Sequence, residues 1–283
     1  MPLVFVPTPL GNLRDITLRA LDVLRDCDLV VAEDSRVARK LLNALALPGK
    51  EIWSYHEHNA RAATAGILDR AAQALVAVVT DAGTPGISDP GNDLVAAARE
   101  AGVALDVLPG ASAAIGAAVL SGFDLRRFVF EGFAPRTSSA RRAALSRSFA
   151  LGIPSIWYES PQRIRALLED IAAVDAQARV FLVREYTKRY EQQILGSAEQ
   201  IAAQLAERVR GEIALVVDPS PVPSEPVAQA DLDGEIDALL ETGASVSAVA
   251  KALSERGFGE RRHIYARATG RKRLRRDASA APR

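Results

Sequence analysis

The stretch TDAGTPGISDPG, residues 80–91, lies between an apolar run, ALVAVV at 74–79, and a helix-like run, NDLVAAAREA at 92–101. On both sides of it, short apolar β-branched runs alternate with longer runs rich in Ala, Leu and Arg. A buried strand, a loop and a helix in this order form a βαβ unit, in which helices cover both faces of a parallel sheet. The sequence therefore predicts an α/β fold with a parallel sheet in the first part of the chain.

The same pattern continues through most of the chain. The first set of expected strands is 3–6, 28–33, 75–80 and 104–108, with helices near 16–26, 36–46, 60–73 and 92–101. A second set of strands is expected at 127–132, 155–159, 179–185, 189–195 and 212–217, with helices near 138–150, 161–174 and 197–209. The segment QQILGS next to RYE suggests an antiparallel pair, so the second sheet is expected to be mixed. We therefore expect two α/β domains, at 1–122 and 123–219.

A third part of the chain follows a proline-rich segment. PSPVPSEPV at 219–227 has four prolines in nine residues and is typical of a stiff, exposed linker. Three helical runs come after it, separated at Gly243 and at GFG. They predict a small helix-turn-helix-like domain at 228–276, and a purely structural helical cap is the alternative.

Composition and charge limit the possible class of protein. The chain has 283 residues, 48% of them hydrophobic, and no apolar run approaches the ~20 residues of a membrane span. The single cysteine, Cys27, fits a reducing compartment, and the N-terminus lacks the pattern of a signal peptide, so a cytoplasmic location without membrane association is expected. Residues 256–276 hold nine Arg or Lys and one acid, which indicates either a polyanionic partner or a solubilising tail.

Three expected strands of the first domain end in loops rich in glycine and proline. These loops are PTPLGN at 7–12, the stretch at 80–91 and PGASAAI at 109–115. Ligands of open parallel sheets bind beyond the carboxyl ends of the strands, where helix N-termini also offer free N–H groups. The loops predict a rigid pocket for a small polar ligand, although each loop taken singly could be purely structural. Since neither G-x-G-x-x-G nor a P-loop motif is present, dinucleotide and P-loop sites are disfavoured.

Two of the three histidines lie in SYHEHN at 54–59. If this segment is a strand, alternation puts His56 and His58 on the same face. A metal site needs a further ligand, to which the sequence does not point, so no metal is expected.

Eight motifs occur in order along the chain. They are VPTPLGNLRDITLRAL (6–21), AEDSR (32–36), SYHEHN (54–59), DAGTPGISDPG (81–91), PGASA (109–113), FEGFAPR (130–136), YESPQR (158–163) and REYTKRYE (184–191). Together they closely resemble the bacterial ribosomal RNA small subunit methyltransferase I family of the tetrapyrrole methylase superfamily, from about residue 2 to 218. The family's small helix-turn-helix domain is similar to the remaining tail. Ser35 stands where threonine is usual in the family and Thr80 where serine is commoner; both keep the hydroxyl.

The resemblance implies two α/β domains with S-adenosylmethionine between them, and 2′-O-methylation of a cytidine ribose in the decoding region of 16S ribosomal RNA of the small ribosomal subunit. It also implies a homodimer. The implied cofactor contacts are Leu10, Asp81, Thr84, Ile87, Ser88, Asp89, Ala111, Ser112, Tyr158, Gly211 and Glu212. A superfamily methylase acting on a tetrapyrrole precursor and a non-catalytic RNA-binding assembly factor are the alternatives.

Other residues are candidates for chemistry or RNA contact. The 2′-hydroxyl is a poor acid, so a general base would help, and the sequence leaves it open among Glu33, Asp34, His56, His58, Glu185 and Lys188. RNA contacts are expected from positive groups, namely Arg136, Arg141, Arg142, Arg163, Arg184, Arg261, Arg262, Arg267, Arg271, Lys272 and Arg273.

Overall fold

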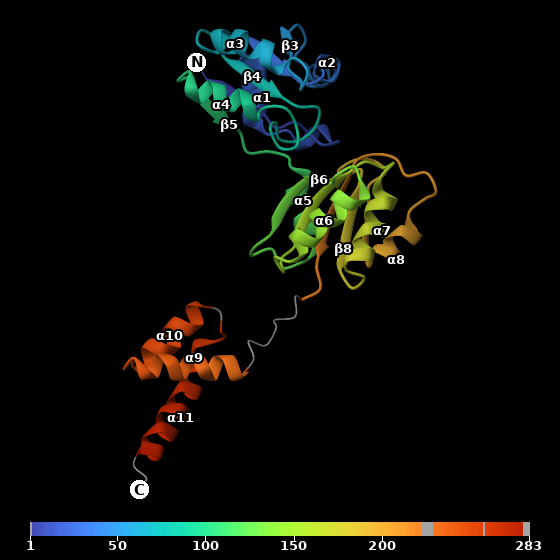
Figure 1. Cartoon of the computed structure of the whole chain (residues 1–283). Coiled ribbons are helices and arrows are strands. Elements are labelled where there is room, and N and C mark those ends of the chain that lie inside the picture. The colour runs from blue at the N-terminus through green and yellow to red at the C-terminus, as the bar shows by residue number, and fades with distance from the viewer. Residues whose placement is uncertain (1, 222–228, 257, 280–283) are drawn as a thin grey trace. The chain divides into compact units, whose positions relative to one another are not determined.

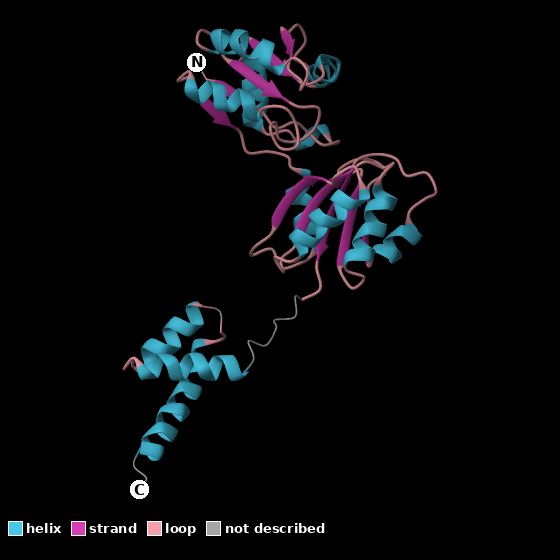
Figure 2. Cartoon of the chain, viewed as in Figure 1, coloured by secondary structure: helices cyan, strands magenta, loops and turns pink. Residues whose placement is uncertain are grey.

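The structure, a computed structural model, describes residues 2–221, 229–256 and 258–279. The chain divides into two compact units, Met1–Ser220 and Pro221–Arg283. The first unit holds two sheets and their helices, and the second is helical (Figures 1 and 2). The linker predicted at 219–227 lies outside the described residues from residue 222 onward. No helix among the described residues is both long and apolar enough to span a bilayer.

The first sheet is parallel throughout, as the sequence predicts, and its strand order is β3-β2-β4-β1-β5. Its strands are β1 (Leu3–Phe5), β2 (Leu29–Ala32), β3 (Ile52–Ser54), β4 (Val76–Val79) and β5 (Leu105–Val107). Between them lie η1 (Leu13–Asp15), α1 (Leu18–Asp26), α2 (Ser35–Ala44), α3 (Ala60–Ala71) and α4 (Asn92–Glu100). The strand β3 was not among the expected strands.

Both faces of this sheet are buried. Successive side chains of a strand point to opposite faces, so Val4 packs in one core with residues of α1 and α2. Leu3 and Phe5 pack in the other core with residues of α3 and α4. The central strands β1 and β4 therefore direct their carboxyl ends to the same edge of a rigid sheet.

The second sheet is mixed, as predicted, in the order β6-β7-β10-β8-β9. Only the β6·β7 pair is parallel. The strands are β6 (Val129–Phe133), β7 (Ser155–Glu159), β8 (Arg179–Arg184), β9 (Gln192–Gly196) and β10 (Ile213–Asp218), and the helices are α5 (Ala113–Ser121), α6 (Ser138–Phe149), α7 (Ile164–Val174) and α8 (Ala198–Gln204).

Helix α5 belongs by its packing to the second sheet. Ala114, Ala117 and Ala118 lie in one core with Ile156 of β7 and Val216 of β10. These small side chains let the helix backbone approach the sheet closely. The opposite face is covered by α6, α7 and α8 around the buried Trp157. The chain thus reaches the second sheet before residue 113, while the domain limits 1–122 and 123–219 stay a prediction.

The second unit is built from three helices, α9 (Gln229–Glu241), α10 (Val246–Glu255) and α11 (Arg261–Ser279). Ile236, Leu253 and Ile264, one from each helix, are fully buried in their common core. The Ser245 hydroxyl accepts the N–H of Ala248 and so caps the start of α10. Helix α11 ends at Ser279, three residues beyond the limit of 276 expected for this domain.

Arg141 is a structural residue, which corrects its expected role in RNA contact. It is only 4% exposed. Its guanidinium donates to the Asp170 carboxylate at 2.7 Å and to the carbonyls of Pro135 and Arg136 at 3.2 Å. Burial would raise the pKa of Asp170, but hydrogen bonds from Arg142, Ser138 and Arg141 lower it overall. The pair therefore joins α6 to α7 inside the protein.

Removing the Asp170 carboxylate should destabilise the fold strongly. Asp170→Ala leaves the Arg141 cation buried without a counter-ion, which costs about 3–5 kcal/mol in the free energy of unfolding, measured by urea denaturation at pH 7. The neighbouring Glu169 is exposed, so Glu169→Ala is the matched control and should change stability by less than about 0.5 kcal/mol. Because the native pKa of Asp170 is lowered, its contribution is present above the unfolded pKa of about 3.9 and disappears as the pH falls through the native value. Equal stability of the two variants at pH 7 would contradict this assignment.

Candidate functional site

Hydrogen bonds fix the three glycine- and proline-rich loops to one another. The Thr8 and Gly83 backbones exchange two hydrogen bonds of 2.8 and 3.0 Å, and the Thr8 hydroxyl donates to the Thr80 carbonyl at 3.1 Å. The Thr84 hydroxyl donates to the Ala111 carbonyl at 3.0 Å. The loops that follow β1, β4 and β5 therefore form one continuous wall, as the sequence pattern suggested.

The 80–91 loop needs its glycine at position 83. Gly83 has φ +88°, a left-handed conformation that L side chains rarely adopt. A Cβ here would also lie 3.3 Å from Leu10 Cδ2. The glycine thus lets the loop approach the side chain that comes from the loop after β1.

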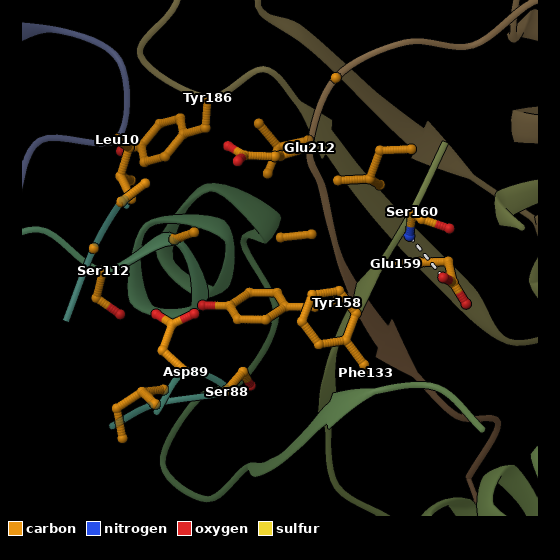
Figure 3. A pocket seen from close by; sticks show the side chains of 18 of the residues that line it. Leu10, Ser88, Asp89, Ser112, Phe133, Tyr158, Glu159, Ser160, Tyr186 and Glu212 are labelled. Carbon is orange, nitrogen blue, oxygen red and sulfur yellow. Dashed lines mark hydrogen bonds between the residues drawn. The ribbon is translucent and has the colours of Figure 1, made fainter. Parts of the chain in front are cut away.

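A cavity of about 340 Å³ lies between this wall and the second sheet (Figure 3). This volume is in the range of small-molecule sites, roughly 300–1,000 Å³. Nine of the expected cofactor contacts line it, namely Leu10, Thr84, Ile87, Ser88, Asp89, Ser112, Tyr158, Gly211 and Glu212. Two do not: Asp81 is exposed, and Ala111 acts through the carbonyl that holds Thr84.

The second sheet contributes residues to the cavity that sequence reasoning missed. They include Phe133, Glu159, Ser160, Tyr186, Ile213 and Ala214. From the sequence, the ends of β7 and β10 were expected to contribute only through Tyr158, Gly211 and Glu212. Phe133 lies in the FEGFAPR motif and Tyr186 lies in the REYTKRYE motif, so these motifs could have pointed to both residues.

Tyr158 is held in place at the centre of the cavity. Its hydroxyl oxygen accepts the N–H of Ala114, at the start of α5, at 3.0 Å. The rings of Phe130 and Phe133 meet the Tyr158 ring edge to face, with centroids 5.2 and 5.7 Å away. Figure 3 shows the Tyr158 hydroxyl pointing toward Asp89. The second sheet thus presents a rigid aromatic surface opposite the loops.

The Asp89 carboxyl has an altered acidity. Burial, with the Glu33, Asp81 and Glu212 carboxylates adding like charge, raises its pKa to about 6, and the Thr80 hydroxyl offsets this only in part. A carboxyl with this pKa is mostly ionised at pH 7 and readily protonated just below it.

Glu185 and Lys188, two candidate bases, neutralise each other beside the cavity. Lys188 Nζ lies 2.9 Å from the carboxylates of both Glu185 and Glu212, and the Glu212 N–H donates to Glu185 at 3.1 Å. Burial would raise the pKa of Glu185, but Lys188 and the Glu212 N–H lower it overall. Both groups are therefore held in their charged forms, so they are better suited to holding neighbouring groups in place than to accepting a proton from the substrate.

A second hollow, of about 600 Å³, adjoins the cavity. Glu33, His56 and His58 line it, together with Ser88 and Asp89, which also line the first cavity. The two histidines do not lie on a strand, contrary to expectation, because β3 ends at Ser54.

The side chain of Asn59 explains this turn. Its amide donates to the Ser54 carbonyl at 2.9 Å and accepts the His56 N–H at 2.8 Å. These bonds satisfy backbone groups that a longer strand would have used.

The carboxylates of the AEDSR motif have different surroundings. Glu33 accepts the Thr80 hydroxyl at 3.0 Å and faces the second hollow. Asp34 accepts the Arg36 N–H at the start of α2 and pairs with the Arg36 guanidinium at 2.6 Å, and these hydrogen bonds lower its pKa. Asp34 is thus a helix cap rather than a base.

Some of the residues expected to contact RNA form ion pairs or hydrogen bonds within the protein, and others are exposed. In the first unit, Arg163 pairs with Glu159, Arg184 donates to the Arg210 and Tyr190 carbonyls, and the half-exposed Arg142 pairs with Asp170. Arg136 is exposed.

In the second unit, Arg267 and Arg271 of α11 pair with Asp233 and Asp237 of α9. The exposed cations of the expected set are Arg261, Arg262, Lys272 and Arg273. No group of His, Cys, Asp or Glu in the described part of the chain could hold a metal ion.

Sequence comparisons place this arrangement in a family. The family described as Tetrapyrrole (Corrin/Porphyrin) Methylases matches residues 2–202. The chain is 39% identical over 218 residues to "Ribosomal RNA small subunit methyltransferase I" of Halalkalibacterium halodurans, covering 76% of this chain and 75% of the relative. Proteins of the same name from Micromonospora olivasterospora and Synechocystis are 40% and 38% identical, over 89% and 93% of this chain and 80% and 95% of the relatives.

The chain belongs to the ribosomal RNA small subunit methyltransferase I family of the tetrapyrrole methylases. Solved structures share its fold. Diphthine synthase aligns with a TM-score of 0.62 at 16% identity, over 78% of this chain and 91% of that one. Uroporphyrin-III C-methyl transferase from Thermus thermophilus, solved with S-adenosyl homocysteine, aligns with a TM-score of 0.53 at 17% identity, over 76% of this chain and 97% of that one.

The Asp89 carboxyl should titrate with a midpoint of about 6 in carboxyl ¹³C NMR. Glu33→Gln should move this midpoint to lower pH because it removes a nearby like charge. Asp69→Asn on the exposed face of α3 is the control and should leave the midpoint unchanged. A midpoint near the ordinary aspartate value of about 3.9 would contradict the assignment.

Proposed function

We propose that this protein is an S-adenosylmethionine-dependent methyltransferase that methylates the 2′-oxygen of a cytidine ribose in the decoding region of 16S ribosomal RNA. The observation that carries the proposal is the cavity between the loops and the second sheet, which is lined by nine of the eleven residues implied as cofactor contacts. The name shared by relatives at 38–40% identity over most of the chain supports the ribosomal RNA substrate.

The residues of the cavity fit S-adenosylmethionine. Apolar and aromatic side chains, such as Leu10, Ile87 and Phe133, suit the adenine ring. The Asp89 carboxyl group suits a hydroxyl group, and the Glu212 carboxylate also suits the ammonium group, since carboxylates accept hydrogen bonds and attract cations. The bound cofactor supplies an electrophilic methyl group on sulfur.

The chain's own contribution is rigid positioning. The Thr8–Gly83 bonds and the Thr84–Ala111 bond fix the loop wall, and the Tyr158–Ala114 bond fixes the aromatic surface opposite it. A preformed cavity loses little conformational freedom when a ligand binds. Orienting the methyl group and the accepting oxygen can supply as much as about 7–11 kcal/mol of the barrier reduction.

The outward face of α11 supplies a surface for RNA phosphates. Arg261, Arg262, Lys272 and Arg273 are exposed, and the exposed Tyr265 lies among them. Arg267 and Arg271 turn instead to the carboxylates of α9 and tie the helix to its own unit. Sequence-independent attraction to the RNA backbone is therefore expected from the exposed residues.

Helix α5 offers a surface for a second copy of the chain. Ile115 and Val119 lie one helical turn apart and are 53% and 68% exposed, while the opposite face of α5 covers the second sheet. Contiguous exposed apolar side chains can mark a protein–protein interaction site. We therefore propose a symmetric homodimer through α5.

A methylation assay tests the enzyme proposal. Small ribosomal subunits from a strain that lacks the enzyme are incubated with S-adenosylmethionine, and the RNA is digested and analysed by mass spectrometry. We expect one new 2′-O-methylcytidine, absent when S-adenosylhomocysteine replaces the donor. Cofactor binding without RNA modification would favour a tetrapyrrole methylase, and RNA binding without cofactor binding would favour an assembly factor.

Thr84→Val should weaken cofactor binding about two- to tenfold, measured by calorimetry, because it removes the hydrogen bond that joins two loops of the wall. Thr64→Val is the matched control, since the Thr64 hydroxyl donates within α3 to the Ala60 carbonyl. The control should bind as the wild type does. Equal affinities for both variants would argue against the loop wall as the cofactor site.

The double change Arg261→Ala and Arg262→Ala should weaken RNA binding and lower the slope of log affinity against log salt by up to about 2, because two phosphate contacts are lost. Lys251 on α10 pairs with Glu255 at 4.0 Å, so Lys251→Ala is the control and should keep the wild-type slope. An unchanged slope in the double variant would remove α11 from the RNA interface.

Val119→Glu should convert the dimer to a monomer in size-exclusion chromatography with light scattering, because it places a charge in an apolar interface. Leu18 on α1 is 79% exposed, and Leu18→Glu should leave the dimer intact. A monomeric wild-type protein at micromolar concentration would contradict the α5 interface.

A further inference from the structure

The hollow beside the cofactor cavity is separated from it by very little protein. Ser88 and Asp89 line both spaces, so one short stretch of the 80–91 loop forms the partition. Ser88 has φ +61°, a left-handed conformation that is uncommon for a residue with a side chain. A group in one space can therefore come close to a group in the other across this stretch.

The hollow is lined by hydrogen-bond acceptors. Glu33, Glu57, Asp89 and Asp93 contribute carboxyl groups, and the structure places no lysine or arginine of its described residues in the lining. Such a lining repels phosphate. It suits a neutral group that carries N–H and O–H donors, such as a nucleobase with an exocyclic amine on a ribose.

One further side chain of the hollow has a polar atom without a partner. The shielded Nδ1 of His56 makes no hydrogen bond with the described residues. Buried polar groups are normally paired, so this atom indicates that the hollow can receive a hydrogen-bonding ligand.

We propose that this hollow binds the accepting nucleoside, with its base between Glu33 and His56 and its ribose at Asp89, and that Asp89 is the general base of methyl transfer. The inference rests on the proposed function, because it needs a ribose oxygen as the acceptor. The nucleotide enters the hollow extruded from its stack, as enzymes that modify nucleotides commonly require.

In the proposed step, the ribose O–H bond breaks and its proton passes to the Asp89 carboxylate, while the oxygen forms a bond to the methyl carbon. The methyl–sulfur bond breaks, and its electrons leave with sulfur as a neutral thioether. Water later takes the proton from Asp89.

The acidity of Asp89 suits this role. A base works best when its pKa lies near the working pH, and burial raises that of Asp89 to about 6. The charged groups that influence it are Glu33, Asp81 and Glu212, and the other titratable groups lining the hollow are His56, His58, Glu57 and Asp93. By contrast, Glu185 is held ionised by Lys188 and is not among the residues that line this hollow.

The first experiment compares Asp89→Asn with the wild type on small ribosomal subunits, at saturating S-adenosylmethionine. We expect the rate of methyl transfer to fall about 10²–10⁴-fold, as for the loss of a general base. Cofactor affinity, measured separately by calorimetry, should stay within about threefold because the amide keeps the shape and polarity of the side chain. The wild-type rate should rise tenfold per pH unit below the pKa of the Asp89 carboxyl and then level, whereas the residual rate of Asp89→Asn should lack this step.

The second experiment tests the hollow itself. His56→Ala should raise the KM for the RNA about three- to tenfold while cofactor affinity is unchanged, because a hydrogen bond to the base is lost. Asp69→Asn, on the exposed face of α3 outside the hollow, is the control and should keep wild-type values.

The outcomes separate this inference from the proposed function. If the wild type modifies no ribose oxygen of the RNA, the proposed function fails and the inference fails with it. If the wild type is active but Asp89→Asn keeps its rate and its pH profile, Asp89 is not the base. If His56→Ala also keeps the wild-type KM, the nucleoside does not bind in this hollow.

Discussion

The site depends on the hydrogen bonds by which Thr8 holds two neighbouring loops together. Strands β1 and β4 are adjacent and parallel, so their carboxyl ends emerge side by side. Thr8 bonds through its backbone to Gly83 and through its hydroxyl to the Thr80 carbonyl, and it is 1% exposed. These bonds satisfy buried polar groups that would otherwise be costly. Since the next residue of the wall, Thr84, reaches the Ala111 carbonyl from this fixed position, the third loop is held by the same constraint.

Much of the fold could be predicted because its strands are buried on both faces. Continuous apolar runs such as VAVV in β4 have few alternatives, and parallel strands bring their loops to one edge. The strand β3 was missed because it has three residues, each only half buried. The turn at His56 was missed because it depends on the side chain of Asn59, three residues beyond it in the chain. Helix α5 could not be assigned to a sheet, because its apolar sequence is compatible with either one.

The sequence shows where the charged residues are, but it does not show which of them form internal ion pairs and which remain exposed. Arg141 and Arg142 are neighbours in one helix, yet the first is buried and the second is half exposed. Both pair with Asp170, which lies in another helix and is distant in sequence, but only Arg141 also donates to the carbonyls of Pro135 and Arg136. The partners of Arg267 and Arg271 likewise lie in another helix, α9. Only a structure shows which cations are engaged internally, and therefore which are left to attract a polyanion.

Two carboxyl groups near the cavity show how one site can separate positioning from proton transfer. Glu185 lies against Lys188, so the ionised form is favoured and the pKa is lowered. Asp89 is shielded from water and surrounded by carboxylates, so the neutral form is favoured and the pKa rises to about 6. Adding a cation beside Asp89 would favour its ionised form and weaken it as a base. The acidic lining of the second hollow therefore has two effects. It keeps the Asp89 carboxylate basic, and it excludes the phosphates that flank the accepting nucleoside.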